Sequence, residues 1–127
     1  MKILPVENTK DLKKFINFPY HFYKDDPNWI PPLRTELNNQ FDPNKNPLLD
    51  HCDYSLFLLI QEGQIIGRIA AFIDQLAVDF WKEKIGLFGY YECIPDESAS
   101  RMLLETAADW LRDQGMESMR GPWTFVS

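Results

Sequence analysis

The fold is decided by residues 85–115, which read IGLFGYYECIPDESASRMLLETAADWLRDQG. The first ten residues, Ile85 to Ile94, carry large apolar or aromatic groups at both odd and even positions. A strand with one face in water alternates apolar and polar residues, so this pattern is typical of a strand that is covered on both faces. The sequence therefore predicts a central strand with other elements packed on each side of it.

A helix is predicted directly after this strand. From Ser98 onward, apolar residues recur at the i, i+3, i+4, i+7 spacing of one helical face. Gly115 supplies the left-handed residue that commonly ends a helix. A strand that feeds a helix packed back on its own sheet often binds a ligand at the joining turn. The predicted buried stripe consists of Ala99, Met102, Leu103, Thr106, Ala107, Trp110 and Leu111.

The N-terminal part is expected to contain one strand and two short helices. The strand covers residues 2–6, and Thr9 is the expected N-cap of a helix over residues 11–18 that Pro19 stops. Residues 20–32 are rich in aromatics and prolines, which favours an ordered loop clamped on the core. A second helix is predicted over residues 33–41, because proline is tolerated in a first turn.

The middle of the chain shows the clearest hairpin. Its strands are expected at residues 54–61 and 65–73, joined through Glu62-Gly63-Gln64. One or two helical turns are expected within residues 76–84. After the helix that ends at Gly115, a further strand is predicted from residue 116 to residue 120, where Gly121-Pro122 interrupts it.

Composition excludes several classes of protein. The 127 residues are 45% hydrophobic and 14% aromatic, which is enough for one core, so a single domain over residues 1–127 is expected. The 13 Lys and Arg against 19 Asp and Glu give a net charge of −6, which argues against nonspecific binding to nucleic acid or to an anionic membrane. No stretch approaches the ~20 apolar residues of a membrane span and the start lacks a signal-peptide core, so a cytoplasmic location is expected.

The two cysteines are expected to be free thiols, because the predicted strands place Cys52 and Cys93 at opposite ends of the sheet. Asp50-His51-Cys52-Asp53 offers four metal-capable side chains in a row. Consecutive residues cannot all converge on one ion, and no second ligand group is evident elsewhere. No metal site is therefore predicted, and a loop that enters a strand is favoured. A thiol-dependent or metal role for either cysteine is the least favoured alternative.

The order strand, helix, helix, hairpin, strand, helix, strand resembles the first two-thirds of the GNAT superfamily of acyl-CoA-dependent N-acyltransferases. More narrowly, residues 12–29, 67–71, 88–92 and 110–122 resemble the N-terminal half of a larger bacterial GNAT-like family. The resemblance implies an α+β fold whose mixed, mostly antiparallel sheet is flanked by helices. It also implies that this fold is C-terminally incomplete here, without the last helix and strands.

The same resemblance implies acyl transfer from acetyl-CoA or another acyl-CoA to an amine, most simply transfer of an acetyl group. Glu92 corresponds in position to a general base that takes a proton from the amine. The resemblance further implies contacts with the cofactor and with the acceptor. The cofactor contacts are Cys93, Ile94, Ser98 and Ser100, and the acceptor contacts are Tyr90, Tyr91 and Trp29.

The turn before the predicted helix departs from the superfamily pattern. Members carry an Arg/Gln-x-x-Gly-x-Gly/Ala loop whose N–H groups cradle the CoA pyrophosphate. Here that spacing falls on residues 95–100, where Pro95 lacks a backbone donor and Asp96 and Glu97 add negative charge suited to capping the helix. This departure favours an alternative, a non-catalytic GNAT-like module for structure or ligand binding.

The C-terminal run Trp123–Ser127 is apolar and strand-like. A natural terminus is usually polar, so we expect the chain to be the N-terminal portion of a longer protein. An unpaired apolar strand also invites pairing between chains. A homodimer or a swapped assembly through this segment is therefore expected as well.

Overall fold

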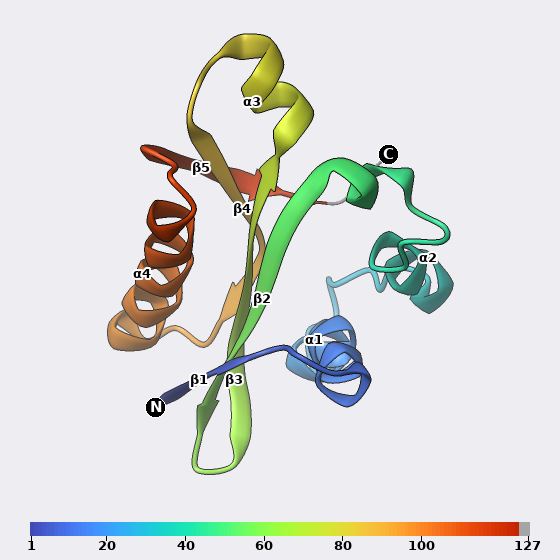
Figure 1. Cartoon of the computed structure of the whole chain (residues 1–127). Helices are drawn as coiled ribbons and strands as arrows, with labels where there is room; N and C mark the ends of the chain where they lie inside the picture. Colours follow the sequence, from blue (N-terminus) through green and yellow to red (C-terminus); the bar gives the residue numbers. More distant parts are fainter. Residues whose placement is uncertain (125–127) are drawn as a thin grey trace.

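The computed structural model describes residues 1–124 and contains a five-stranded sheet between two layers of helices (Figure 1). The strand order is β1-β2-β3-β4-β5, and neighbours are antiparallel except for the parallel pair β4 and β5. The predicted mixed, mostly antiparallel α+β fold is confirmed. The elements are β1 (Lys2–Pro5), α1 (Thr9–Phe22), α2 (Arg34–Gln40), the 3-10 helix η1 (Pro47–His51), β2 (Cys52–Gln61), β3 (Gln64–Asp74), α3 (Gln75–Trp81), β4 (Ile85–Cys93), α4 (Glu97–Asp113) and β5 (Ser118–Trp123).

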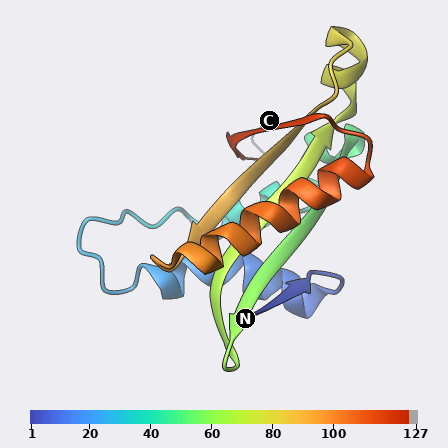
Figure 2. The ribbon, with the colours of Figure 1, turned by 90° about the vertical axis from the view of Figure 1, so that its left-hand side faces the viewer.

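Each face of the sheet is covered by its own helices. Helix α4 lies on one face and α1 and α2 lie on the other, as the two views in Figures 1 and 2 show. The α4 face buries an apolar cluster to which β2, β3 and α4 contribute. The α1 face buries a second cluster built around Phe15, Phe41 and Tyr90.

Strand β4 lies between β3 and β5, and the predicted internal position of residues 85–94 is confirmed. The helix after it packs on the same sheet with Ala99, Leu103, Ala107 and Leu111 buried. This packing is close because glycines face the helix. A Cβ on Gly67 would lie 2.7 Å from Leu103 Cδ1, and one on Gly86 would lie 2.5 Å from Leu111 Cδ2. Leu103 and Leu111 of α4 thus approach the strand backbone directly at these two glycines.

Helix α1 differs from the prediction at both ends. Its N-cap is Asn8 and not Thr9, because the Asn8 side chain accepts a 2.8 Å hydrogen bond from the Asp11 N–H. Pro19 does not stop the helix, which continues to Phe22. Proline removes one hydrogen bond inside a helix, and a helix tolerates this when other contacts hold both sides of the gap. Phe18 and Pro19 are themselves buried, so packing holds this turn in place.

The hairpin and the last strand extend further than predicted. The β2–β3 turn consists of two residues, Glu62 and Gly63, which both have positive φ (52° and 77°). Such turns match the twist of the flanking strands. Strand β5 runs through Gly121-Pro122 to Trp123, with a shift of its register on β4 between Leu87 and Gly89. The rest of the segment expected to pair between chains, residues 125–127, lies outside the described residues.

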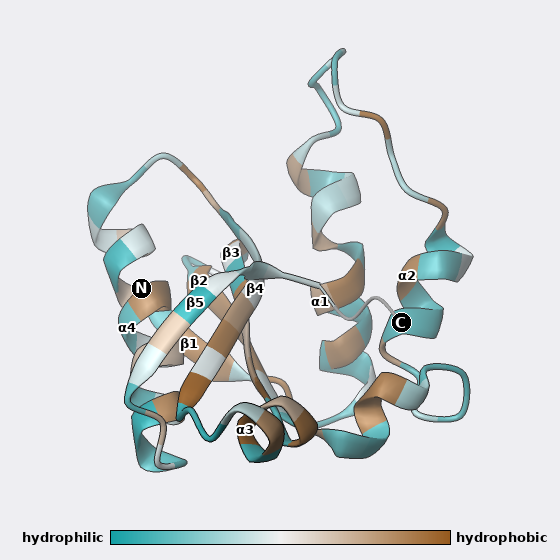
Figure 3. Ribbon diagram, turned by 90° about the horizontal axis from the view of Figure 1, so that it is seen from above, coloured by the Kyte–Doolittle hydropathy of each residue, from teal (hydrophilic) through white to brown (hydrophobic). Residues whose placement is uncertain are grey.

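Helix α3 projects from one end of the sheet between β3 and β4 (Figure 1). It corresponds to the helical turns expected within residues 76–84, and its apolar residues include exposed Leu76, Phe80 and Trp81. The apolar colouring of α3 and β4 is visible in Figure 3. Within residues 1–124, none of the helices has the length and apolar character that crossing a lipid bilayer requires.

Candidate functional site

Strands β4 and β5 separate halfway along β4. Strand β5 pairs with β4 from Ile85 as far as Gly89, whereas β4 continues to Cys93. On the other side, β3 stays paired with β4 as far as the Gly67 and Cys93 pair. Within residues 1–124, no strand pairs with residues 91–93 on the β5 side. In the described part of the chain, the C-terminal half of β4 is therefore paired on its β3 side only, and its backbone at residues 91–93 forms a strand edge on the β5 side.

A β-bulge lies at this separation point. Arg68 pairs with Glu92 and Ala70 pairs with Gly89, so Tyr90 and Tyr91 together oppose one residue of β3. Tyr90 has a positive φ of 49°, a left-handed conformation that one type of bulge uses for its first residue. Tyr90 belongs to the cluster on the α1 face, whereas Tyr91 packs against the α4 cluster. Tyr90 and Tyr91 thus lie on opposite faces of the sheet.

Glu92 is held by Arg68. Arg68 Nη2 donates to Glu92 Oε1 at 2.6 Å, and Arg68 Nε donates to the same oxygen at 3.1 Å. The side chains are 5% and 15% exposed, so this pair is shielded from water. Burial lowers the pKa of Arg68, and the charge of Glu92 and its hydrogen bond act in the opposite direction. The two hydrogen bonds from Arg68 to one oxygen fix the orientation of the Glu92 carboxyl group.

The third contact of Arg68 depends on Pro19. Arg68 Nη1 donates to the carbonyl oxygen of Phe15 at 2.7 Å. In a regular helix that carbonyl accepts the N–H of residue 19, which proline lacks. The missing donor in α1 is thus replaced by a guanidinium from β3. The same guanidinium lies 4.9 Å from the Phe15 ring centroid and 5.6 Å from the Tyr90 ring centroid.

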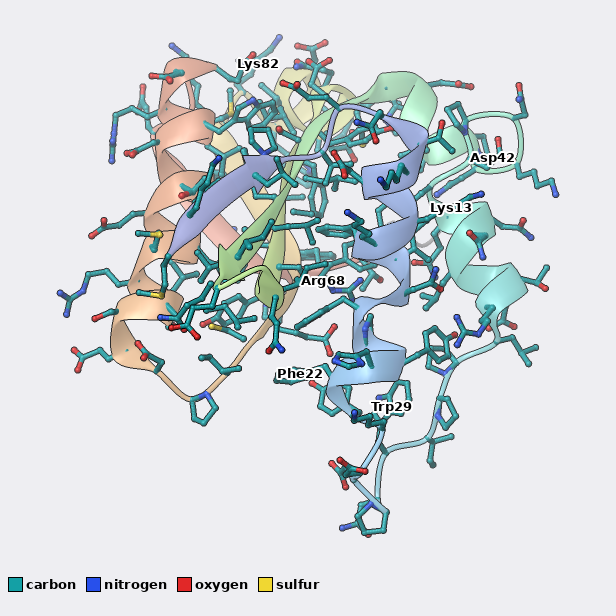
Figure 4. The ribbon with its side chains drawn as sticks, turned by 90° about the horizontal axis from the view of Figure 1, so that it is seen from below. Lys13, Phe22, Trp29, Asp42, Arg68 and Lys82 are labelled. Carbon is teal, nitrogen blue, oxygen red and sulfur yellow. The ribbon has the colours of Figure 1, made fainter. Side chains whose placement is uncertain are left out.

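Tyr23 and Trp29 extend this cluster toward the surface. Burial, followed by the hydrogen bond and negative charge of Glu92, raises the pKa of Tyr23 to about 12. Tyr23 therefore stays protonated at neutral pH and serves Glu92 as a donor. The Trp29 ring stacks on Tyr23 with the centroids 5.1 Å apart. Figure 4 shows Arg68 between the sheet and α1, with Phe22 and Trp29 at the C-terminal end of that helix.

The loop that carries Trp29 is held by contacts at both sides, but the prediction of a loop over residues 20–32 clamped on the core is wrong, because residues 20–22 belong to α1 and residues 24–28 and 30–32 are exposed. The Tyr20 hydroxyl donates to the Pro32 carbonyl at 2.5 Å, and Tyr20 also makes an edge contact with Trp29. Arg34 lies over the Tyr20 ring at 3.8 Å and donates to Asn17. The loop therefore forms an ordered aromatic wall beside Tyr23.

The predicted cofactor residues lie around the start of α4. Asp96 caps the helix by accepting the Ala99 N–H at 3.0 Å, as expected for this turn. The Ser100 side chain is engaged by the Tyr91 hydroxyl, and the Ile94 N–H donates to the Ile66 carbonyl. Ser98 is exposed in the first turn. Helix capping by an acidic side chain thus occupies part of the place where a phosphate group would bind.

The structure brings together only part of the predicted site. Tyr90 is buried in the cluster of the α1 face and donates to Gln40 at 2.5 Å. Glu92 adjoins this cluster through Arg68, and Trp29 reaches Glu92 only through the Tyr23 ring on which it stacks. The residues predicted on the cofactor side lie with α4 on the other face of the sheet or at the turn that leads to it. They are Cys93, Ile94, Ser98 and Ser100, and Tyr91, which was predicted to contact the acceptor, lies on the α4 face as well. Their roles in binding remain predictions.

Arg68 is the main residue that sequence reasoning missed. It lies in the run Ile65-Ile66-Gly67-Arg68-Ile69-Ala70-Ala71, and only 4% of it is exposed. A charged residue within an apolar strand is almost never fully buried unless it is paired. That signal predicts a partner, but it does not identify the partner, because Glu92 lies 24 residues away in the sequence.

Chemically, the α1 side of this site offers a fixed carboxylate next to a strand edge. A carboxylate with one oxygen occupied by Arg68 can still attract a cationic amine, or accept its proton directly or through water. The aromatic wall of Tyr23 and Trp29 suits an apolar or cationic group. The arrangement is compatible with acyl transfer to an amine.

Two relatives match nearly the whole chain. Protein YghO of Escherichia coli is 41% identical over 118 residues, which cover 93% of this chain and 30% of that protein. The bacterial ceramide synthase of Caulobacter vibrioides is 36% identical over 126 residues, which cover 98% of this chain and 33% of that enzyme. The chain thus spans about a third of the length of these relatives. No family model matches the chain.

Solved acetyltransferases share the fold. An aminoglycoside acetyltransferase from a soil metagenome, in complex with sisomicin, has a TM-score of 0.63 at 16% identity and covers 96% of this chain and 76% of its own. A predicted acetyltransferase from Clostridium acetobutylicum, solved with acetyl-CoA, has a TM-score of 0.63 at 13% identity. The match covers 97% of this chain and 82% of that protein's chain. A GNAT-family acetyltransferase from Staphylococcus aureus has a TM-score of 0.60 at 15% identity and covers 93% and 71%. The predicted resemblance is confirmed: the chain has the GNAT fold.

Proposed function

We propose that this chain forms part of an acyl-CoA-dependent N-acyltransferase. The observation that carries the proposal is the position of Glu92, a carboxyl group oriented by Arg68 next to the free edge of β4. A strand edge offers backbone N–H and C=O groups to an extended ligand. The edge at residues 91–93 therefore suits the acyl thioester, and the α1 face suits the amine.

In this proposal the amine nitrogen attacks the thioester carbonyl. A C–N bond forms, the C–S bond breaks, and CoA leaves as the thiolate, which takes up a proton from solvent. The proton lost by the amine passes to Glu92, directly or through water, and from there to solvent. Arg68 and Tyr23 keep the carboxylate in place during this transfer.

The first turn of α4 fits the phosphate groups of CoA less well. The side chain of Asp96 already caps the helix, and Glu97 adds a second negative charge. Anions bind helix N-termini through free N–H groups, and acidic side chains compete with them there. Binding of CoA is therefore expected to be weak unless groups beyond residues 1–124 contribute.

The acyl group and acceptor are suggested by the relative that is 36% identical and named a ceramide synthase. A ceramide is the amide of a fatty acid and a long-chain amino alcohol. We therefore propose that the complete protein transfers a long acyl chain to a long-chain amine in preference to acetyl transfer. Tyr23 and Trp29 are the candidates for contact with the amine end.

Calorimetric titration of the natural full-length protein with acetyl-CoA and with a long-chain acyl-CoA tests this proposal. We expect heat with the long-chain thioester, and turnover with a long-chain amine that Glu92→Gln abolishes while binding persists. Glu105→Gln, an exposed change on α4, is the matched control and should leave turnover unchanged. Absence of heat with both thioesters would remove the protein from this enzyme class.

The alternative is a non-catalytic module that associates through its C-terminal strand. Two observations favour it: the acidic cap of α4, and Trp123, which is 55% exposed at the end of β5. This reading predicts a dimer in light scattering that Trp123→Ser converts to a monomer. A monomer in the wild-type protein would contradict this association, and turnover of acyl-CoA would contradict the non-catalytic module.

A further inference from the structure

Three metal-capable side chains converge at the end of the sheet from which α3 projects (Figure 1). Cys52 opens β2 and Asp74 closes β3, and the two form a directly opposed cross-strand pair. His51 Nδ1 lies 3.1 Å from Asp74 Oδ1. The donor atoms of the three residues all lie within 4.8 Å of one another.

The convergence of the consecutive residues His51 and Cys52 has a structural cause. The sequence argued against a shared ion because consecutive residues cannot all converge on one ion, and neighbouring residues of a strand do point to opposite faces. His51, however, is the last residue of the 3-10 helix η1, and only Cys52 belongs to the strand. The change of backbone conformation at this junction brings both side chains toward Asp74. Asp74 is the second ligand group that sequence reasoning did not find.

We propose that His51, Cys52 and Asp74 bind one zinc ion. A thiolate, an imidazole nitrogen and a carboxylate oxygen are the ligands that zinc takes in proteins, at about 2.0–2.3 Å. Tetrahedral geometry at these lengths separates ligand atoms by about 3.3–3.7 Å. Donor atoms already within 4.8 Å reach that spacing by small side-chain rotations.

The remaining coordination position opens into a pocket. A cavity of about 550 Å³ adjoins the site, and both Cys52 and Asp74 line it. Much of its wall is apolar, with contributions from Leu48, Phe72 and Val78. Zinc sites with three protein ligands and an open position leave room for water or another small ligand. This site is therefore accessible to an ion although Cys52 itself is buried.

Binding requires two exchanges. The Cys52 thiol gives its proton to solvent as the Zn–S bond forms. His51 Nδ1 gives up its contact with Asp74 and binds the ion instead. Asp74 Oδ1 caps α3 by accepting the N–H groups of Leu76 at 3.1 Å and Ala77 at 3.3 Å. No described residue donates a hydrogen bond to Asp74 Oδ2, which leaves that oxygen for the metal.

Titration with Co²⁺, a spectroscopic substitute for zinc, tests the proposal in the purified protein. Thiolate coordination to Co²⁺ produces a near-ultraviolet charge-transfer band that oxygen and nitrogen ligands do not give. We expect this band at one equivalent and its loss in Cys52→Ser. The matched control is Cys93→Ser, which removes the other thiol at the opposite end of the β2–β4 meander and should keep the band. Excess Zn²⁺ should bleach it.

A second measurement guards against misfolding of the variant. Zn²⁺ should protect Cys52 of the wild-type protein from alkylation, read by peptide mass spectrometry, and should leave alkylation of Cys93 unchanged as the internal reference. Absence of the charge-transfer band in the wild-type protein, or its survival in Cys52→Ser, would overturn the proposal. Equal alkylation of Cys52 with and without Zn²⁺ would overturn it too. The inference does not depend on acyl transfer.

Discussion

Among residues 1–124, the α4 face of the sheet buries an apolar cluster at its centre, whereas the α1 face buries the guanidinium of Arg68 among aromatic rings. On the α4 face, Leu103 and Leu111 meet the strands directly over glycines. On the α1 face, Arg68 contacts two separate elements, the Phe15 carbonyl in α1 and Glu92 in β4. The stability of the α4 face thus depends on close apolar packing, and that of the α1 face depends on a buried ion pair.

This difference indicates which substitutions each face of the sheet tolerates. Apolar packing tolerates exchange between side chains of similar volume. A buried charge does not, because each donor requires its partner. We therefore expect stability to be distributed along α4 but concentrated at Arg68 on the α1 face. A costly buried charge beside a strand edge is also where function is expected.

The largest effect is expected from Arg68→Ala. It leaves Glu92 and the Phe15 carbonyl without their donor in a site shielded from water. Removal of one partner of a buried ion pair costs about 3–5 kcal/mol in the free energy of unfolding. Urea denaturation measures this loss. A loss below about 1 kcal/mol, the range of an exposed pair, would show that the two faces do not differ as described.

The double variant Arg68→Met with Glu92→Met separates structure from function. Apolar residues of similar length remove both charges together, so much of the lost stability should return. If acyl transfer uses Glu92, the double variant should fold and yet be inactive. Recovery of stability together with activity would confine Glu92 to a structural role.

On the other face, Leu103→Ala is expected to cost about 3 kcal/mol, because it removes a fully buried side chain and leaves a cavity. Thermal or urea unfolding gives the value. Glu105→Ala on the exposed side of the same helix is the control and should change stability by less than about 0.5 kcal/mol. A similar loss in both variants would argue against α4 packing as described.

The α4 face could be predicted from sequence, because its signals are local. The strand at 85–94, the stripe from Ala99 to Leu111, the acidic cap and the left-handed Gly115 each lie within a few residues of what they determine. The α1 face required information that a single sequence does not contain. Arg68 joins Phe15, 53 residues away, and Glu92, 24 residues away.

Pro19 shows how a local rule fails. The rule that proline ends a helix assumes that the carbonyl it leaves free finds no other donor. Here the Phe15 carbonyl accepts a hydrogen bond from Arg68 of strand β3, so the helix continues for three residues beyond Pro19. In the same way, the argument against a metal site failed to foresee Asp74, because the pairing of Cys52 with Asp74 depends on a register shift between Leu59 and Ile60.

A double-mutant cycle between Pro19 and Arg68 sharpens this explanation. In the Pro19→Ala background the restored N–H can donate to the Phe15 carbonyl, so loss of Arg68 no longer leaves that oxygen without a partner. Arg68→Ala should then cost about 1 kcal/mol less than in the wild-type background, the worth of one hydrogen bond. Urea denaturation of the four proteins gives the coupling. Strict additivity would mean that the Arg68 contact does not replace the helical hydrogen bond.

The smallest effect concerns Tyr23 and appears only at alkaline pH. Its pKa is raised to about 12 in the folded protein from an ordinary value of 10.0, by burial and then by Glu92. A raised folded-state pKa contributes stability that is present below the unfolded value and is lost as pH rises through the folded one. The wild-type protein should therefore lose stability between about pH 10 and 12 more steeply than Tyr23→Phe, as measured by urea denaturation across that range. Because lysines and the other tyrosines titrate in both proteins, only the difference between the two curves reports Tyr23. Parallel curves would show that the Tyr23 hydroxyl does not interact with Glu92. The charged cluster of the α1 face would then consist of the Arg68 and Glu92 pair alone.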